Sequence, residues 1–483
     1  MAGERHLETK KTETNRRYSH NSFTDNNIAQ ARTSIPSVFV STLTTPYPWH
    51  LIRYMPYPHT AKTQAPAVMQ HPAIAQTKAP ATPTFEPYLS HLRAALTFLV
   101  ICHHTAIGLG GAGDWYFVIP PPPDSPAFMA LTLFTAVNQS FFMALFFFIA
   151  GYLTPSSLER KGTARYLMDR FIRLGIPLLV YYFLLSPCAV YQAYRCTPPE
   201  MLSERLVRRV DLSPATRAFF ESVICRFSRS HAGSLWAFFQ ETWPAYCGPG
   251  PLWFTETLLI FTCAYILWRV IHPWKPALTL PGTRDILSFI FAMGLMAFVI
   301  RLVFPVGAFL PVLGIQPAHF PLYIALFIVG TMARPSGWLN QLQPAFTRRW
   351  FLAACGTVCL MPVILAAGSS GPGGVNAFLG GLSWQAAVYS LMEPVLCVGI
   401  CLQLLVAFRD YFNQPSLPGR LLSENAYAAY IIHPFFVIAA TCMSRSWGWD
   451  PLVKFLPLCL LAAIPAFTAA ALLRRMPLLH RVL

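Results

Sequence analysis

Arg93 and His104 stand at the two ends of one apolar run, HLRAALTFLVICHH, and their types and spacing are suited to chemistry. The run is long enough to begin a membrane-spanning helix, where ionisable side chains are costly and usually functional. On an α-helix their spacing places both residues on one face, about 20° apart, with a rise of about 16 Å. His103 points about 80° away from that face. A cation at one level and a base at another predict a site for a long ligand that is anionic at one end and partly apolar.

The composition predicts a polytopic membrane protein around these residues. The 483 residues are 54% hydrophobic and only 12% charged, whereas soluble domains carry about 25% charged residues. Ten apolar segments can each carry a helix of about 20 residues. They span 89–110, 127–153, 172–192, 251–271, 285–306, 317–333, 350–368, 381–408, 426–443 and 452–473. We therefore expect an all-α, multi-pass membrane protein with about ten transmembrane helices.

The net charge of +16 is best explained by membrane topology. No basic patch with interleaved aromatic residues stands out, so we expect no nucleic-acid partner. If the N-terminus is cytosolic, the inward connections and the C-terminal tail carry sixteen Lys and Arg residues, and two short outward connections carry none. That is the positive-inside pattern, and it predicts that both termini are cytosolic. Exceptions near the outward ends are Arg301, Arg445 and Lys454.

Composition also divides the chain. Residues 1–86 are polar and rich in Thr, Ser, Asn and Pro, as expected for a disordered cytosolic tail. Residues 87–475 hold the ten spans, with a long non-cytosolic loop at 193–250, and residues 476–483 form a C-terminal cytosolic tail. The twelve cysteines lie mostly in apolar runs, which favours packing over a zinc site or a disulfide framework. We expect no metal and no permanently bound cofactor.

A basic connection follows the second span, which ends in FFFIAGYL. Its basic residues are Arg160, Lys161, Arg165, Arg170 and Arg173. Beside a cytosolic opening such a cluster can hold phosphate groups. Positive-inside anchoring and contact with anionic lipid explain it as well.

Two further spans carry polar residues at depth. Glu256 lies in the fourth span, GPGPLWFTETLLIF. An intramembrane carboxylate needs a partner, and His104 or an arginine is the natural one, although a Glu that reaches the headgroups is nearly as reasonable. The ninth span, ENAYAAYIIHPFFVI, contains Tyr430 and His433. Pro434 has no N–H, so the Tyr430 carbonyl loses its helical donor and becomes a free acceptor beside His433. A histidine that only packs between helices is the alternative.

Several of these pieces, in this order and spacing, resemble the acyltransferase 3 family of integral membrane acyltransferases. They are the Arg93–His104 spacing, FFFIAGY, the basic RYLMDRFIRLGIPLLV, GPLWFTETLLIF and AYAAYIIHP. Together with the ten spans they cover about residues 87–475. Two positions depart from the family: Ala150 replaces a frequent serine, and Pro251 replaces a frequent histidine. No hydroxyl role and no acceptor-binding histidine can be assigned at those positions.

The resemblance implies transfer of an acyl group from a cytosolic acyl-CoA, as donor substrate, to a hydroxyl acceptor. His104 matches the family's proposed catalytic histidine and Arg93 its essential partner. A neutral imidazole suits a general base near neutral pH, so we expect His104 to act as the base with Glu256 as its orienting partner. Arg93 and the basic connection would hold the CoA phosphates. Motifs of a covalent acyl-enzyme are missing, which favours direct transfer.

The acceptor cannot be read from the residues. A secondary-metabolite alcohol and a glycan hydroxyl are both possible acceptors. The family commonly transfers short acyl groups, so acetyl is the default expectation for the transferred group. A transporter or channel would use the same intramembrane polar residues, but the sequence lacks the internal symmetry that such proteins often show. A scaffold or lipid-binding protein would not need polar groups at depth.

Overall fold

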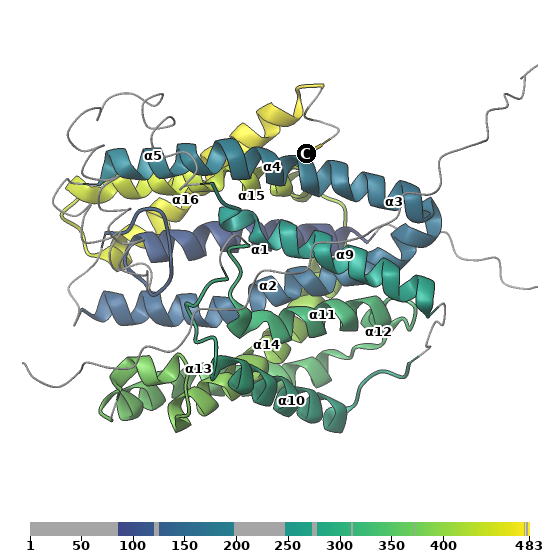
Figure 1. Ribbon diagram of the computed structural model, residues 1–483, viewed down its shortest axis with the longest axis horizontal. Helices are drawn as coiled ribbons and strands as arrows, with labels where there is room; N and C mark the ends of the chain where they lie inside the picture. The colour runs from purple at the N-terminus through teal and green to yellow at the C-terminus, as the bar shows by residue number, and fades with distance from the viewer. Residues whose placement is uncertain are drawn as a thin grey trace, which may run out of the picture. The chain divides into compact units, whose positions relative to one another are not determined.

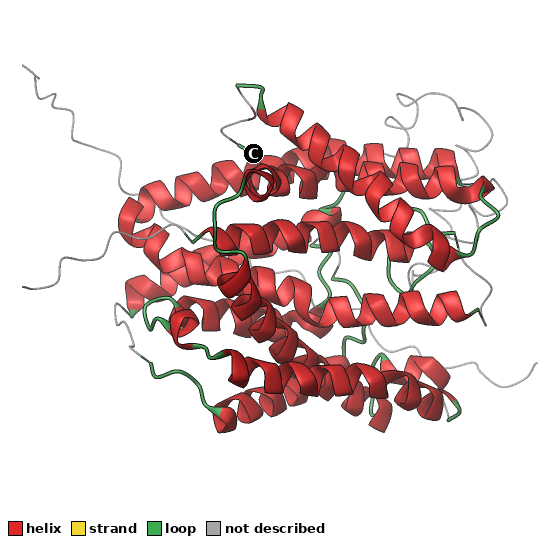
Figure 2. Cartoon of the chain, turned by 180° about the vertical axis from the view of Figure 1, so that it is seen from behind, coloured by secondary structure: helices red, strands yellow, loops and turns green. Residues whose placement is uncertain are grey.

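Helices account for all the regular secondary structure in the described part of the chain (Figure 2). The computed structural model describes residues 86–119, 125–197, 247–272, 278–310, 313–371, 373–477, 479 and 482–483. The predicted all-α class is therefore confirmed. The proposed N-terminal tail and nearly all of the proposed 193–250 loop lie outside the described residues.

Helices occupy all ten predicted positions. They are α1 (Pro87–Gly108), α2 (Pro126–Lys161), a continuous helix from α3 (Thr163–Arg170) to α5 (Ser186–Cys196), α9 (Trp253–Ile271), α10 (Thr283–Arg301), α11 (Phe320–Ala333), α13 (Pro344–Ser369), α14 (Trp384–Tyr411), α15 (Leu417–Met443) and α16 (Pro451–Arg474). In the described part of the chain, eight are long and apolar enough to cross a membrane. The other two are α11, which is short, and α1, whose Arg93 and three histidines lower its mean hydropathy. The chain is a multi-pass membrane protein.

α1, which carries Arg93 and His104, lies at the centre of the bundle. In Figure 1, α1 and α2 run between α15 and α16 on one side and α13 and α14 on the other. α1 packs against α15, α2, α14 and α16, and α2 also packs against α11. α1 is therefore enclosed by other helices, and its polar residues face protein as well as any ligand.

Glycine allows the central helices to approach closely. At Gly151 of α2 a Cβ atom would collide with the Phe327 carbonyl of α11, and at Gly330 of α11 it would collide with the Phe148 carbonyl of α2. Such contacts between backbones are the usual way in which membrane helices pack, because lipid supplies no hydrophobic force between them. The FFFIAGY segment thus has a packing role at this crossing.

Two π-helical turns interrupt the helix from α3 to α5. They are η1 (Phe171–Gly175) and η2 (Tyr181–Leu185), separated by α4 (Ile176–Val180). A π turn frees backbone groups from the regular ladder and is frequent at functional sites. At η1 the Arg173 carbonyl accepts a hydrogen bond from the Tyr427 hydroxyl at 2.8 Å. At η2 the Tyr181 hydroxyl lies 2.9 Å from that of Tyr116.

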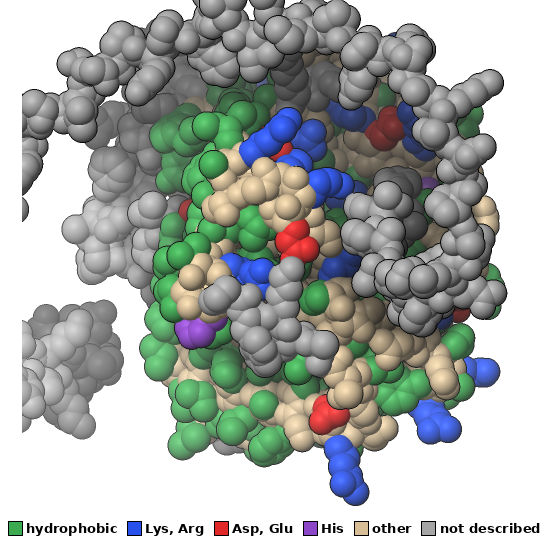
Figure 3. Space-filling model, turned by 90° about the vertical axis from the view of Figure 1, so that its right-hand side faces the viewer, with side chains coloured by type: hydrophobic (Ala, Val, Ile, Leu, Met, Phe, Trp, Pro, Cys, Tyr) green, Lys and Arg blue, Asp and Glu red, His purple; other side chains and the backbone are tan. Residues whose placement is uncertain are grey.

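One end of the bundle is strongly basic. Figure 3 looks onto the end where α3 and α12 (Trp338–Gln341) lie, and Lys and Arg side chains gather there. Arg334 pairs with Glu86 at 2.8 Å, which ties the end of α11 to the start of α1. Arg409 donates to the carbonyls of Leu339 and Leu342. This end contains the predicted inward connections, of which Lys275 and Arg481 lie outside the described residues. That it faces the cytosol stays a prediction.

Candidate active site

His104 and His433 come together although 329 residues separate them in the chain. Nδ1 of His104, on α1, lies 2.9 Å from Nε2 of His433, on α15. The two rings are nearly parallel, with an interplanar angle of 10° and centroids 5.0 Å apart. We call these two residues the histidine pair.

Aromatic side chains from the loop after α1 cover the histidine pair. The indole of Trp115 stacks on the His104 ring at 3.9 Å and 13°, and it lies 5.8 Å from the His433 ring. Trp115 and the adjacent Tyr116 make an edge contact at 5.2 Å. Tyr116 connects this loop to η2 through Tyr181. The sequence alone did not single out these aromatic residues, because they lie in a short connection without periodicity.

The other nitrogen of His104 is available. His104 is partly exposed, and within the described residues its Nε2 has no hydrogen-bond partner. His103, in contrast, is buried and packs against Phe142 with ring centroids 4.8 Å apart. The two neighbouring histidines thus diverge as helix geometry predicted. Of the two, His104 is the one that can meet a substrate.

Tyr430, which lies on α15 with His433, contacts the histidine pair through its backbone. Its backbone carbonyl lies 2.6 Å from Nδ1 of His433. Its hydroxyl donates to the Pro251 carbonyl, at the start of α9. The Pro251 position, which departs from the family pattern, therefore lies next to Tyr430 and contributes a backbone acceptor. Tyr430 and His433, singled out from the sequence, are both buried at this site.

Arg93 lies on the same face of α1 as His104, toward the basic end. Its side chain is exposed and makes one weak hydrogen bond, to Ser90 at 3.4 Å. Arg170 is a charged neighbour of Arg93 and of the Tyr427 hydroxyl, and it is held by the Tyr166 hydroxyl at 3.0 Å.

Among the predicted basic residues, Lys161 pairs with Asp169, and the arginines differ from it. In the described part of the chain, no carboxylate makes an ion pair with Arg93, Arg165, Arg170 or Arg173. Arg165 and Arg173 are exposed. Their positive charges interact electrostatically with Asp169, whose carboxylate forms its ion pair with Lys161 at 2.5 Å. Guanidinium groups that gather without a counterion favour an anionic ligand.

Glu256 does not meet the expectation that it orients His104. Its Oε2 is buried without a hydrogen-bond partner among the described residues, and Nδ1 of His104 bonds His433 instead. Glu256 follows Trp253 and Phe254, and Phe254 packs against Tyr430 with centroids 6.3 Å apart. Glu256 is therefore near a residue that contacts Tyr430, but it makes no hydrogen bond to the histidine pair among the described residues.

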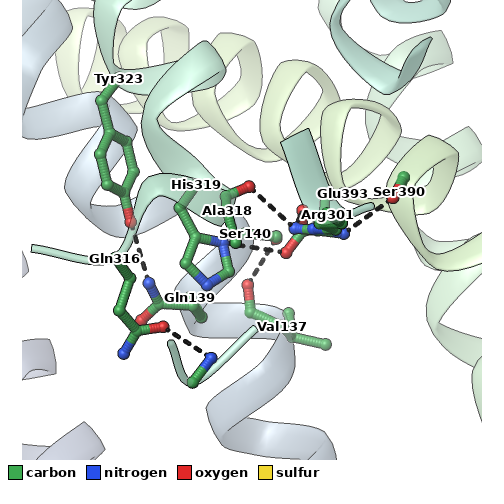
Figure 4. Close-up of polar contacts among 11 residues, drawn as sticks. Val137, Gln139, Ser140, Arg301, Gln316, Ala318, His319, Tyr323, Ser390 and Glu393 are labelled. Carbon is green, nitrogen blue, oxygen red and sulfur yellow. Dashed lines mark hydrogen bonds and ion pairs between the residues drawn. The ribbon is translucent and has the colours of Figure 1, made fainter. Parts of the chain in front are cut away.

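A second buried group lies apart from the histidine pair and is built on charges (Figure 4). Arg301 of α10 forms an ion pair with Glu393 of α14, and also donates to the Ser390 hydroxyl at 3.1 Å and the Ala318 carbonyl at 3.3 Å. Nδ1 of His319, just before α11, lies 3.3 Å from Glu393. We call Arg301, His319, Ser390 and Glu393 the charged cluster. All four are buried, and they join α10, α11 and α14.

Within the described ranges, no three His, Cys, Asp or Glu side chains lie close enough to hold a metal ion. What the histidine pair offers is a hydrogen-bonded imidazole with one accessible nitrogen, which can accept a proton from a substrate.

Comparison with known proteins gives one match. No curated protein and no solved structure matches the chain. A family model described as an acyltransferase domain matches residues 86–474, which include every helix described above. The chain therefore belongs to the acyltransferase 3 family and is a membrane acyltransferase.

Proposed function

We propose that this protein transfers a short acyl group, acetyl by default, from acyl-CoA to a hydroxyl of a small-molecule or glycan acceptor, with His104 as general base. An alcohol attacks a thioester poorly near neutral pH unless its proton is removed as the new bond forms. A neutral imidazole is suited to this step.

One observation carries the proposal: His104 has one ring nitrogen held by His433 while the other has no partner among the described residues. A histidine that only packs would have both nitrogens satisfied or enclosed. Trp115 lies flat on the His104 ring. When the imidazole takes up a proton, the face of the indole stabilises the positive charge.

The donor is expected to bind from the basic end. Arg93 and Arg170 are neighbours, and among the described residues neither makes an ion pair with a carboxylate, which suits the phosphates of CoA. From Arg93 to His104 the rise along α1 is about 16 Å. A donor with its charges at one end and its thioester at the other matches that separation.

Direct transfer needs no covalent acyl-enzyme. The acceptor oxygen attacks the thioester carbonyl while its proton passes to Nε2 of His104. The carbon–sulfur bond then breaks, and the CoA thiolate leaves and takes the proton from His104. The products are the acylated acceptor and free CoA.

The test is an assay with purified protein in proteoliposomes. With acetyl-CoA and a pool of hydroxyl acceptors, mass spectrometry should find an acetylated product that forms together with free CoA. His104→Ala protein should form neither, and its thermal unfolding should match the wild type to show that it is folded. Normal turnover of His104→Ala would refute the role of His104. Uptake of a solute without any acyl product would point to the transporter alternative.

A further inference from the structure

The Tyr430 carbonyl is the starting point of a chain of defined hydrogen bonds. In a regular helix this carbonyl would accept the N–H of residue 434, but Pro434 has none. Nδ1 of His433 lies 2.6 Å from it instead. A carbonyl can only accept, so Nδ1 of His433 must carry its proton.

That first assignment determines the next one. In a neutral imidazole with Nδ1 protonated, Nε2 is an acceptor. Nε2 of His433 faces Nδ1 of His104 at 2.9 Å, so Nδ1 of His104 must be the donor. Nε2 of His104 then holds a lone pair and is the nitrogen that has no hydrogen-bond partner among the described residues. The backbone of α15 thus determines which nitrogen of α1's histidine is basic.

We propose that His433 is a positioning residue that fixes the tautomer of His104 through the Tyr430 carbonyl freed by Pro434. This inference rests on the proposed function of His104 as base. The arrangement performs the orienting role that the sequence suggested for Glu256, and it does so without a carboxylate. A neutral imidazole is less costly to bury at membrane depth than an unpaired carboxylate.

The same chain of bonds responds when the reaction proceeds. As the acceptor O–H bond breaks, its proton goes to Nε2 of His104, which becomes an imidazolium. Its Nδ1–H bond to His433 is then charge-assisted and therefore stronger. When the carbon–sulfur bond breaks, the departing thiolate takes the proton back from Nε2, and the starting tautomers are restored.

A spectroscopic measurement tests the tautomer without any turnover. Histidines of the full chain are labelled with ¹⁵N in lipid nanodiscs at a pH where the imidazoles are neutral. The signals of the pair are assigned by their loss in His104→Gln and His433→Gln protein. We expect a protonated Nδ1 and an unprotonated Nε2 for both residues. A protonated Nε2 on His104 would overturn the proposal.

Two replacements at position 433 test the effect on catalysis. In His433→Gln the side-chain carbonyl stands near the position of Nε2 and can still accept from His104. In His433→Leu no acceptor remains. We expect kcat to fall by about 10²- to 10⁴-fold in His433→Leu, in line with the loss of a histidine's orienting partner. In His433→Gln we expect kcat to recover at least tenfold over the leucine variant, with the KM for acetyl-CoA unchanged in both.

The outcomes separate this inference from the proposed function. A role in packing alone would lower thermal stability equally in both variants and would not restore kcat with glutamine, and that result would overturn the proposal. Near-normal kcat in His433→Leu would do so as well. If His104→Ala is inactive while His433→Leu is active, only the positioning role fails. If His104→Ala is active, the proposed function itself fails.

Discussion

The charged cluster and the histidine pair contain similar residues, but those residues are paired differently. Each contains histidine, and each has an arginine in it or on the same helix. Arg301 is part of the charged cluster, and Arg93 lies on the same face of α1 as His104. The difference is a carboxylate. Glu393 contacts both Arg301 and His319, whereas His104 and Arg93 have no carboxylate partner among the described residues.

That difference suits the charged cluster to a structural role and the histidine pair to a catalytic one. A buried arginine that is ion-paired with a carboxylate, as Arg301 is with Glu393, joins the helices around it. An arginine without a counterion and an imidazole with one available nitrogen are open to a ligand, because their unmet interactions can be made by substrate. The acyltransferase thus keeps its compensated charges where helices meet and its uncompensated groups along the face of α1.

Breaking the charged cluster should have the largest effect on stability. Arg301→Leu leaves Glu393 buried without its partner, and we expect the free energy of unfolding to fall by about 3–5 kcal/mol. Thermal unfolding of purified protein in detergent measures the change. Unaltered unfolding would contradict a structural role for the cluster.

Removing both charges together should undo much of that loss. In Arg301→Met with Glu393→Leu no charge remains buried, and such replacements are often neutral or stabilising. We expect the double variant to unfold close to the wild-type temperature and to keep its kcat per folded molecule. Loss of kcat in a stable double variant would instead draw the cluster into catalysis.

Removing the Arg93 charge tests whether an arginine without a carboxylate partner binds the donor. Arg93→Gln should raise the KM for acetyl-CoA by about 10- to 100-fold, as expected for one charged hydrogen bond, and should leave kcat nearly unchanged. With acetyl-pantetheine, which lacks the phosphates, the variant and the wild type should have equal KM. Arg348, which is exposed at the same basic end, provides the control variant Arg348→Gln. An equal KM increase in the control would mean that net charge, not Arg93, attracts the donor.

Loss of the ring over His104 should have the smallest effect. Trp115→Leu keeps an apolar cover but removes the aromatic face, and we expect kcat to fall by about 2- to 30-fold, the range of a cation–π contact. Steady-state kinetics at saturating acetyl-CoA measure it. Trp115→Phe should recover part of the loss, and an equal loss in both variants would show that the size of the side chain matters more than its face.

The sequence predicted the helices better than the contacts between them. All ten helices lie where hydropathy placed them, because twenty apolar residues in a row have few other structures available in a membrane. Helical periodicity also predicted that His104 and His103 diverge. The approach of His433 to His104 could not be predicted, because it depends on how α1 and α15 pack, and periodicity carries no information on packing partners.

Two features of the sequence could have predicted more of these contacts. Pro434 indicated a free carbonyl beside His433, and the structure uses that carbonyl. Arg301 was noted only as an exception to the charge asymmetry, and Glu393 lies in the eighth predicted span, so the rule that charges in a membrane are paired could have joined them. Glu256 was expected to orient His104, but His433 takes that position and is itself held by the Tyr430 carbonyl.

The most direct test compares one histidine from each group in the same proteoliposomes. His104→Gln and His319→Gln make the same chemical change, one in the histidine pair and one in the charged cluster. At equal amounts of folded protein, we predict that kcat for acetyl transfer falls by about 10²- to 10⁴-fold in His104→Gln, the usual contribution of a general base. His319→Gln should keep most of its kcat, because the glutamine amide can still donate to Glu393. Equal losses in the two variants, or a larger loss in His319→Gln, would contradict the account.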